Sequence, residues 1–342
     1  MKTISIAMAT YNGARFITEQ LESFVHQTVL PNELVVTDDN STDNTLEIVA
    51  AFAAKAPFSV RYQKNEKQLG FRANFMKAAT LCSGDLISFS DQDDVWLPTK
   101  LETCVAAFEN EKVLLVYHDV IVVNEFLKPM NVRDNQAAPK QINHRHTIDP
   151  WRLSMGFTQT FRRVLLSFNE QWNRSVDFRD VTSQEAHDQW FFFLASCLGI
   201  LVYINEPLAL YRQHRNNTYG WNNSLIFQQA WNRFTSGDTK DIAAREISAR
   251  QRALSLEKSQ DKVADDFKIN TTKAALGYRK LEMNYRKRRL IYESDAIYSR
   301  LRQIMSMIIS GGYKPKNQWG AGKRALIRDI IRGIIFPMQI PF

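Results

Sequence analysis

Three carboxylates follow a short apolar run at residues 86–89, which has the length and composition of a buried strand. Asp91, Asp93 and Asp94 stand within four residues, and like charges this close repel one another and resist burial. We therefore expect a cation among them, and hard oxygen ligands favour Mg²⁺ or Mn²⁺. The alternative is a solvated acidic turn before a helix, with Asp94 near the helix N-terminus.

The bulk properties limit the possible partners and compartments. The chain of 342 residues is long enough for one large α/β domain with an appendage, and its net charge of +8 favours an anionic partner such as nucleotide phosphates, nucleic acid or a lipid surface. Its three cysteines form no metal motif, which fits a reduced, cytosolic compartment. The N-terminal apolar stretch is too short for a signal peptide, and no run approaches the roughly 18 apolar residues of a membrane span.

The first sixty residues alternate strand and helix patterns. Apolar runs at residues 4–9, 33–37 and 60–63 predict strands, and helical spacing of apolar residues predicts helices over 14–25 and 46–54. This order predicts an α/β fold with a doubly wound, mostly parallel sheet. A glycine-rich dinucleotide turn and a Walker A loop are both missing after these strands.

Other side chains occupy the predicted strand ends. Tyr11 follows the first strand, and Asp38 and Asp39 follow the second. An aromatic ring can stack on a base, and a carboxylate can accept from a base N–H or a ribose hydroxyl, although capping of the next helix is an equal alternative. Arg72, near a predicted helix N-terminus, is either a phosphate contact or a surface arginine.

Taken in order, these motifs closely resemble family 2 glycosyltransferases of the GT-A fold, and most of all the branch often labelled rhamnosyltransferase-like. The resemblance covers roughly the first 220 residues, and its strength comes from the ordered set rather than from any one piece. The motifs are Thr10-Tyr11-Asn12, Asp38-Asp39 with Asp43, Leu69-Gly70 with Asn74, Gly84-Asp85, and Asp91-Gln92-Asp93-Asp94 with Trp96.

The resemblance implies a donor site and a metal site. Asp91 and Asp93 would form the family's Asp-X-Asp motif, with Asp93 reaching a Mn²⁺ or Mg²⁺ ion that bridges the donor diphosphate. His214, which follows a Tyr-Arg pair, would be a second metal ligand, although a lone histidine is usually structural. The residues implied for nucleotide and donor binding are Thr10, Tyr11, Asp39, Asp91 and Asp94. We add Arg72 as our own candidate for a phosphate or sugar contact.

Asp188 is the expected catalytic base. It precedes an apolar helix, at the place where the resemblance puts the acid that deprotonates the acceptor, and Glu185 is the fallback. Without the resemblance, Asp188 is equally a helix cap or a partner of the helix dipole. The resemblance implies that Gly156 and Thr158 line the acceptor pocket, and a plain core strand is an equal alternative for them. Trp190 is a further, weaker acceptor candidate.

We expect two domains: a GT-A catalytic domain over residues 1–220 and a helical, basic region over 221–342. The last helical pattern, residues 322–336, has apolar residues on one side and four cations on the other. This composition is typical of a helix lying on an anionic membrane surface, and packing on the catalytic domain or on a dimer partner is the alternative.

The expected activity is metal-dependent, inverting transfer of rhamnose or a hexose from a dTDP- or UDP-sugar to a saccharide or lipid-linked acceptor in surface polysaccharide synthesis. The expected place is the cytoplasm, peripherally on the inner membrane face, with no nucleic-acid partner. Two alternatives are a nucleotidyltransferase, which would need a glycine-rich activation loop that is missing here, and a catalytically inert membrane-surface scaffold.

Overall fold

The computed structural model describes residues 2–130, 141–215, 239–260 and 265–335. The chain divides into two compact units. The sheet unit contains residues 1–145, 153–166 and 186–221, and the helical unit contains residues 146–152, 167–185 and 222–342. The domain boundary expected near residue 220 lies outside the described residues.

The described part of the sheet unit is built on one nine-stranded sheet, in the order β3-β2-β1-β4-β8-β6-β9-β5, with β7 paired to β9. Strands β3, β2, β1 and β4 run parallel, as do β6 and β9, whereas β8, β5 and β7 pair antiparallel to their neighbours. The strands are β1 (Ile4–Thr10), β2 (Glu33–Asp38), β3 (Ser59–Lys64), β4 (Leu86–Ser90), β5 (Val95–Trp96), β6 (Val113–Asn124), β7 (Gln141–Asn143), β8 (Gln159–Arg162) and β9 (Ile200–Gln213).

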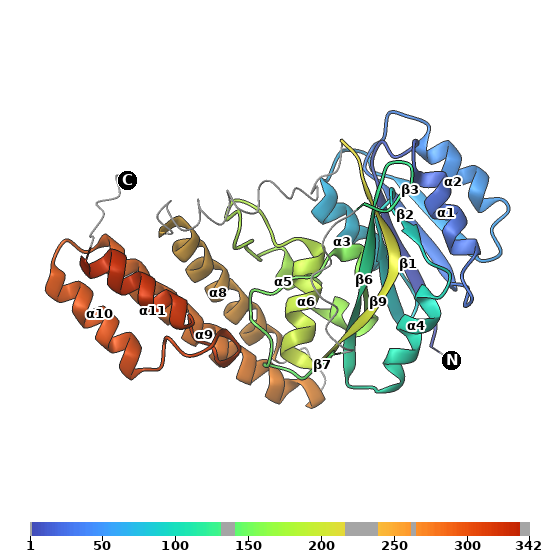
Figure 1. Cartoon of the computed structure of the whole chain (residues 1–342). Coiled ribbons are helices and arrows are strands. Elements are labelled where there is room, and N and C mark those ends of the chain that lie inside the picture. Colours follow the sequence, from blue (N-terminus) through green and yellow to red (C-terminus); the bar gives the residue numbers. More distant parts are fainter. Residues whose placement is uncertain (1, 131–140, 216–238, 261–264, 336–342) are drawn as a thin grey trace. The chain divides into compact units, whose positions relative to one another are not determined.

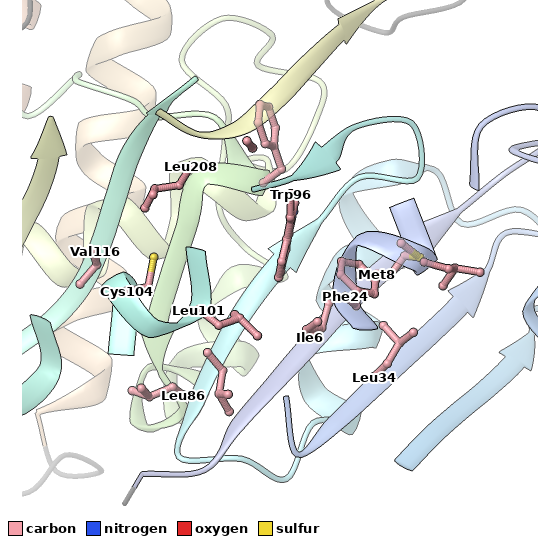
Figure 2. Packing of buried hydrophobic residues seen from close by; sticks show 14 of the residues in the cluster. Ile6, Met8, Phe24, Leu34, Leu86, Trp96, Leu101, Cys104, Val116 and Leu208 are labelled. Atoms are coloured by element: carbon pink, nitrogen blue, oxygen red, sulfur yellow. The ribbon is translucent and has the colours of Figure 1, made fainter. Parts of the chain in front are cut away.

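Helices cover both faces of this sheet, as a doubly wound fold requires. Figure 1 shows α1, α2 and α4 on one face and α3 and α6 on the other. On the first face, side chains from β1, β2 and β4 pack against α1 and α4 in the cluster drawn in Figure 2. The helices are α1 (Ile17–Val25), α2 (Thr45–Ala53), α3 (Phe71–Leu81), α4 (Lys100–Ala106) and α6 (His187–Leu198).

The strand and helix patterns of the N-terminal half are confirmed. The predicted strands at 4–9, 33–37 and 60–63 are β1, β2 and β3. The first helix begins three residues later than its apolar pattern suggests, because the Gly13 carbonyl accepts from the backbone N of both Phe16 and Ile17 and closes a turn there. All three cysteines are buried and free.

The helical unit contains α5 (Asn169–Trp172), α8 (Thr239–Ser259), α9 (Asp265–Glu293), α10 (Ile297–Ile309) and α11 (Lys323–Ile330). Helix α9 packs against α8 and α10, and α10 contacts α11 (Figure 1). A small core of Ile291, Ile304, Met307, Tyr313, Ala321 and Ala325 holds the last three helices together. Across the described residues, no helix combines the length and the apolar character that crossing a membrane requires.

Candidate functional site

The predicted site residues gather where three adjacent parallel strands end. Thr10 is the last residue of β1, Asp38 is the last of β2, and Asp91 directly follows β4. Parallel strands end at the same edge of their sheet, which is where α/β proteins bind ligands. The sheet unit therefore brings the strand-end residues of the sequence pattern to one edge.

Asp38 organises the loop after β2. Its Oδ2 accepts from Thr10 Oγ1 at 2.8 Å, and its Oδ1 accepts from the backbone N of Ser41, also at 2.8 Å. Helix α2 has Asn44 as its N-cap residue, without a side-chain cap bond. Asp38 therefore fixes the loop between strand and helix and does not cap α2.

The Asp39 carboxylate accepts hydrogen bonds from the loop before α3. Its Oδ1 accepts from the backbone N of Leu69 at 2.7 Å and from Asn65 Nδ2 at 2.9 Å, and its Oδ2 accepts from the backbone N of Gly70 at 2.9 Å. These donors orient the carboxylate, while a carboxylate has about four acceptor sites in all. The geometry thus leaves Asp39 the capacity to accept one further N–H or hydroxyl.

Tyr11 is connected through Gln92 to residues 91–94, which we call the acidic loop. Gln92 Oε1 accepts from the backbone N of Tyr11 at 2.8 Å, and Gln92 Nε2 donates to the Tyr11 carbonyl at 2.9 Å. A Cβ on the neighbouring Gly13 would lie 2.2 Å from Gln92 Oε1 and would displace this side chain. The Tyr11 side chain is 45% exposed, which leaves it able to contact a ligand.

Asp93 and His214 lie side by side although 121 residues separate them in the chain. His214 Nε2 is 2.7 Å from Asp93 Oδ2, and the His214 ring packs 4.7 Å from the Phe16 ring. One carboxylate oxygen and one imidazole nitrogen are suitable first ligands for Mn²⁺ or Mg²⁺. In the described part of the chain no set of three or more His, Cys, Asp or Glu forms a metal site.

Burial and mutual repulsion make the ionised carboxylates of the acidic loop unfavourable. Burial, together with the charges of Asp93 and Asp188, raises the pKa of Asp91 to about 8. Burial and the same loop's charges also raise the pKa of Asp94 well above its usual range. Asp94 Oδ1 accepts from the backbone N of Arg212 at 3.0 Å, whereas its buried Oδ2 has no hydrogen-bond partner among the described residues. Crowded carboxylates of this kind are what a bound cation relieves.

Lys100 supplies a positive charge to this loop from inside the protein. The side chain is completely buried, and its Nζ donates to the Phe157 carbonyl at 2.6 Å and lies 3.5 Å from the centroid of the Trp96 ring. Burial lowers the pKa of Lys100 to about 7, against the opposing charges of Asp94 and Asp91. The lysine is thus a buried countercharge to the carboxylates.

Arg212 braces the same loop. Its Nε donates to the Asp93 carbonyl at 2.7 Å, its Nη1 donates to the Glu125 carbonyl at 2.8 Å, and its Nη2 pairs with Glu19. The guanidinium also lies 4.6 Å from the centroid of the Phe16 ring. Arg212 therefore joins β9, α1 and the acidic loop.

Asp188 lies in the first turn of α6 but does not cap this helix. The N-cap residue is Ala186, and no side chain makes a cap bond. Asp188 Oδ1 accepts from the backbone N of Gln189 at 2.8 Å, and its charge contributes to the raised pKa of Asp91. Glu185, the fallback base, is completely buried and pairs with Arg252 Nε at 2.6 Å, so its carboxylate is committed to a structural ion pair.

Gly156 makes room for the residue before Asp188. A Cβ on Gly156 would lie 2.5 Å from His187 Nε2, and the His187 ring stacks on Phe75 with centroids 4.0 Å apart. Burial, assisted by the charge of Arg72, lowers the pKa of His187 to about 3, so the imidazole is neutral. Gly156, His187 and Arg72 thus lie together next to the start of α6.

The other acceptor candidates are interior residues. Trp190 is completely buried, with its ring 5.3 Å from that of Phe193. Thr158 is buried as well, and its Oγ1 donates to the Met155 carbonyl at 2.7 Å. The Gln159 side chain, by contrast, donates to the Asp188 carbonyl at 3.1 Å. A role for Thr158 or Trp190 towards an acceptor stays a prediction.

Sequence reasoning missed three residues of this region. Gln92 is the variable position inside Asp-X-Asp, Lys100 reads as an ordinary first-turn helix residue, and His187 sits beside the expected base. Only Lys100 left a signal: it follows Trp96 by four residues, soon after the apolar run at residues 86–89.

Comparison with known proteins gives a family for the N-terminal half and several relatives. The family model described as Glycosyl transferase family 2 matches residues 5–168. An uncharacterised glycosyltransferase of Nostoc sp. is 27% identical over 224 residues, which are 63% of this chain and 66% of that protein. The dTDP-rhamnosyl transferase RfbG of Shigella flexneri is 29% identical over 227 residues, 64% of this chain and 75% of that protein.

A shorter match concerns a protein whose name states its substrates. The Escherichia coli UDP-Glc:alpha-D-GlcNAc-diphosphoundecaprenol beta-1,3-glucosyltransferase WfaP is 28% identical over 144 residues, 42% of this chain and 55% of that protein. This chain thus spans just under two thirds of the Nostoc relative and about half of WfaP.

Solved structures agree on the fold. A TarS fragment of S. aureus in complex with UDP superposes with a TM-score of 0.52 at 17% identity, covering 92% of this chain and 93% of the fragment. The complex with UDP-GlcNAc gives a TM-score of 0.51 at 18% identity, with the same coverage of both chains. At this identity the likeness shows the fold alone, which is the expected GT-A arrangement with a helical C-terminal region.

Proposed function

Residues 5–168 belong to glycosyl transferase family 2, and on that premise we propose that the chain is an inverting glycosyltransferase using a nucleotide-sugar donor. The observation that carries the proposal is the place of Asp188. It opens α6 without capping it, and its charge acts on Asp91 of the acidic loop. A carboxylate placed this close to a donor site is suited to take a proton from an acceptor hydroxyl.

The proposed reaction is a single displacement. The acceptor oxygen forms a bond to the anomeric carbon of the donor sugar as the bond from that carbon to the diphosphate breaks. The proton of the acceptor hydroxyl passes to the Asp188 carboxylate. Attack from the face opposite the leaving diphosphate inverts the configuration at the anomeric carbon. Tyr11 and Asp39 would hold the base, with Asp91 nearer the ribose or sugar.

Substitution of Asp188 tests the proposed base. Asp188→Asn keeps the size of the side chain and removes its basicity, so we expect transfer to fall by about 10²–10⁴-fold. Nucleotide affinity, measured by calorimetry on the same preparation, should stay at the wild-type value. Asp85→Asn, at the opposite end of β4, is the matched control and should keep full activity. Loss of nucleotide binding in Asp188→Asn would instead make Asp188 a structural residue.

We further propose that a Mn²⁺ or Mg²⁺ ion binds through Asp93 and His214. The adjacent oxygen and nitrogen ligands and the crowded carboxylates fit such an ion. When bound through Asp93 and His214, the ion would supply positive charge that neutralises the leaving diphosphate. Arg212 holds the loop through its bond to the Asp93 carbonyl, and Lys100 interacts with the charges of Asp94 and Asp91.

Metal dependence is tested by calorimetry with UDP and dTDP, each with Mn²⁺, Mg²⁺ or chelator. We expect the metal to strengthen nucleotide binding by the wild-type protein. Asp93→Ala and His214→Ala should bind nucleotide equally with metal and with chelator. Metal-dependent binding that survives in both variants would remove this pair from the metal site.

The substrates are proposed at the level of class. The donor is a dTDP- or UDP-sugar carrying rhamnose or a hexose, and the acceptor is a hydroxyl of a saccharide or lipid-linked saccharide in surface polysaccharide synthesis. The names of RfbG and WfaP support these classes, and a lipid-linked acceptor favours work at the inner membrane face. A thermal-shift panel of UDP, dTDP and GDP with metal identifies the donor nucleotide, because a ligand of the folded state raises its stability. No shift with any of them would favour the inert scaffold.

A further inference from the structure

Helix α10 of the helical unit carries its apolar side chains on two opposite faces. One face packs inward, with Arg300, Ile304 and Met307 buried. The other face is exposed: Tyr298 is 78% and Ile309 is 81% accessible. The remaining exposed apolar residues of α10 are Ile297, Leu301, Met305 and Ile308. The small core beneath α10 therefore leaves this second face unused by folding.

Helix α11, which contacts α10, and the π-helical segment Ile331–Ile335 that follows it repeat the arrangement. Ala325, Asp329 and Gly333 face inward at a spacing of four residues. The outward apolar residues are Ile327, Ile330, Ile331 and Ile335. The terminal helix thus has an apolar exposed side, but Leu326 and Ile334, expected on that side from the sequence, pack against the small core instead.

The charge of this segment has one sign at its surface. Residues 297–335 contain a single carboxylate, Asp329. Asp329 is completely buried and accepts from Arg288 at 2.8 and 2.9 Å, from Tyr292 at 2.7 Å and from Tyr313 at 2.9 Å. The exposed charges of the segment are cations, among them Arg302, Lys314, Lys323 and Arg324. The outer surface of residues 297–335 therefore has no exposed carboxylate to balance these cations.

An open hollow of about 590 Å³ borders the exposed face of α10. Its described lining is Tyr298, Leu301, Arg302, Met305, Ser306, Ile309 and Ser310. Apolar side chains beside a guanidinium match the boundary of a bilayer, where acyl chains and lipid phosphates meet.

We propose that the exposed residues of α10 and α11, named here the apolar–basic face, dock on the surface of an anionic lipid bilayer. The apolar side chains would enter the boundary between headgroups and acyl chains, and the cations would face the lipid phosphates. Charge complementarity selects this occupant. A second copy would bring cations against cations, while a bilayer offers both the negative charge and a deformable apolar phase. The docking face itself does not depend on the proposed function. Its use, access to a lipid-linked acceptor, does rest on the proposed glycosyl transfer.

Vesicle flotation of the full chain tests the proposal, with vesicles of phosphatidylcholine alone or with about a third phosphatidylglycerol. We expect binding to the anionic vesicles, and weaker binding as salt rises. The variant Tyr298→Ser/Leu301→Ser/Ile309→Ser should lower the partition constant by about tenfold or more, since it removes three large apolar side chains from the contact. Arg302→Gln/Lys323→Gln should weaken binding to the anionic vesicles and leave any binding to the phosphatidylcholine vesicles unchanged.

The matched control lies on α9, where Ile269 and Leu276 are each 66% exposed. Ile269→Ser/Leu276→Ser removes comparable apolar surface outside the apolar–basic face and should keep wild-type flotation. Equal loss in this control, equal binding to neutral vesicles, or no flotation of folded protein would overturn the proposal. So would a wild-type dimer, seen by light scattering, that the α10 triple variant converts to a monomer.

Nucleotide binding measured on the same preparations separates the two levels of inference. A protein that binds nucleotide but not vesicles overturns the docking face and leaves the proposed glycosyl transfer standing. A protein that binds anionic vesicles but no nucleotide overturns the proposed glycosyl transfer and leaves the docking face standing.

Discussion

The chemistry of the site rests on carboxylates that are kept close together and on one buried cation. Asp91 and Asp94 have raised pKa values, and Lys100 has a lowered one, all three mainly because of burial. Burial thus favours the neutral form of each of the three groups. A site in this condition gains most from a divalent ion, since the ion stabilises every ionised carboxylate at once.

The buried His187 predicts a pH dependence of stability. Its pKa is about 3 in the folded protein against 6.5 ordinarily, so below pH 6.5 the unfolded chain binds a proton that the folded chain refuses. Lowering the pH from 7 to 5 should therefore destabilise the fold through this group by about 2 kcal/mol. His187→Leu removes the titrating ring without adding length towards Gly156.

Urea unfolding at pH 7 and pH 5 measures this contribution. The loss of unfolding free energy between the two pH values should be about 2 kcal/mol smaller in His187→Leu than in the wild type. His26→Gln, a change at an exposed histidine, should retain the wild-type loss. Identical losses in His187→Leu and the wild type would show that His187 gains its proton in the folded state.

Single residues were predictable where they mark the end of a strand. Thr10, Asp39 and Asp91 could be placed because an apolar run fixes where a parallel strand stops. Lys100 and His187 could not be placed in this way, since a lysine or histidine becomes a buried group only through contacts with distant segments. The Phe157 carbonyl that holds Lys100 is 57 residues away.

At the scale of elements, one arginine connects the acidic loop to its supports. Arg212 lies near the end of β9 and bonds to the Asp93 carbonyl, the Glu125 carbonyl and Glu19. It also orders Asp94 through its backbone N. The position of the acidic loop thus depends on β9, which is more than a hundred residues away in sequence.

Arg212→Met should destabilise the protein by about 3 kcal/mol, because it leaves buried carbonyl acceptors and an ion pair without their partner. Arg15→Met is a matched control. Arg15 also lies over the Phe16 ring and pairs with Glu125, but from an exposed position, so its loss should change stability by about 0–1 kcal/mol. Urea unfolding compares the two, and equal effects would mean that Arg212 has no special part in holding the loop.

Elements were easiest to predict where one periodicity dominates. Strands β1, β2 and β4 were recognised because buried parallel strands read as unbroken apolar runs. The outward face of α10 was missed for the opposite reason. Its apolar residues lie on both a buried and an exposed face, and the sequence does not state which of them the small core uses.

At the scale of the whole molecule, the helical unit gathers segments that are far apart in the chain. Arg252 of α8 donates to Glu185 at 2.6 Å and to the Pro150 carbonyl at 2.7 Å, and its Nη1 lies 3.2 Å from the Tyr278 hydroxyl. All of these residues belong to the helical unit. The buried ion pair thereby ties residues 146–152 and 167–185 to the long helices.

Glu185→Gln tests that tie and also separates Glu185 from Asp188. Leaving Arg252 charged and without its carboxylate should lower the unfolding free energy by about 3 kcal/mol, while the folded variant keeps its transfer rate. Glu257→Gln breaks another arginine pair of the same unit, with Arg279, which is partly exposed and should cost about 1 kcal/mol or less. Thermal unfolding measures the loss of stability in each variant, and a transfer assay measures the retained activity. A stable but inactive Glu185→Gln would return Glu185 to the list of candidate bases.

Composition predicted a helical, basic C-terminal region. It predicted this region as one continuous segment that begins near residue 220. Segments 146–152 and 167–185 cluster with that region in space. Nothing in their composition distinguishes them from loops of the sheet unit, because their membership depends on partners such as Arg252 that lie later in the chain.

The two hydrogen bonds between Gln92 and Tyr11 have a thermodynamic consequence. On the proposed roles, Tyr11 meets the nucleotide base and Asp93, next to Gln92, meets the metal, so each ligand orders the backbone on which the other depends. Coupling between two binding events is reciprocal: if the metal improves affinity for the base, the base improves affinity for the metal by the same factor. If the coupling is larger for the base that Tyr11 fits best, selection among nucleotides should sharpen as metal is added.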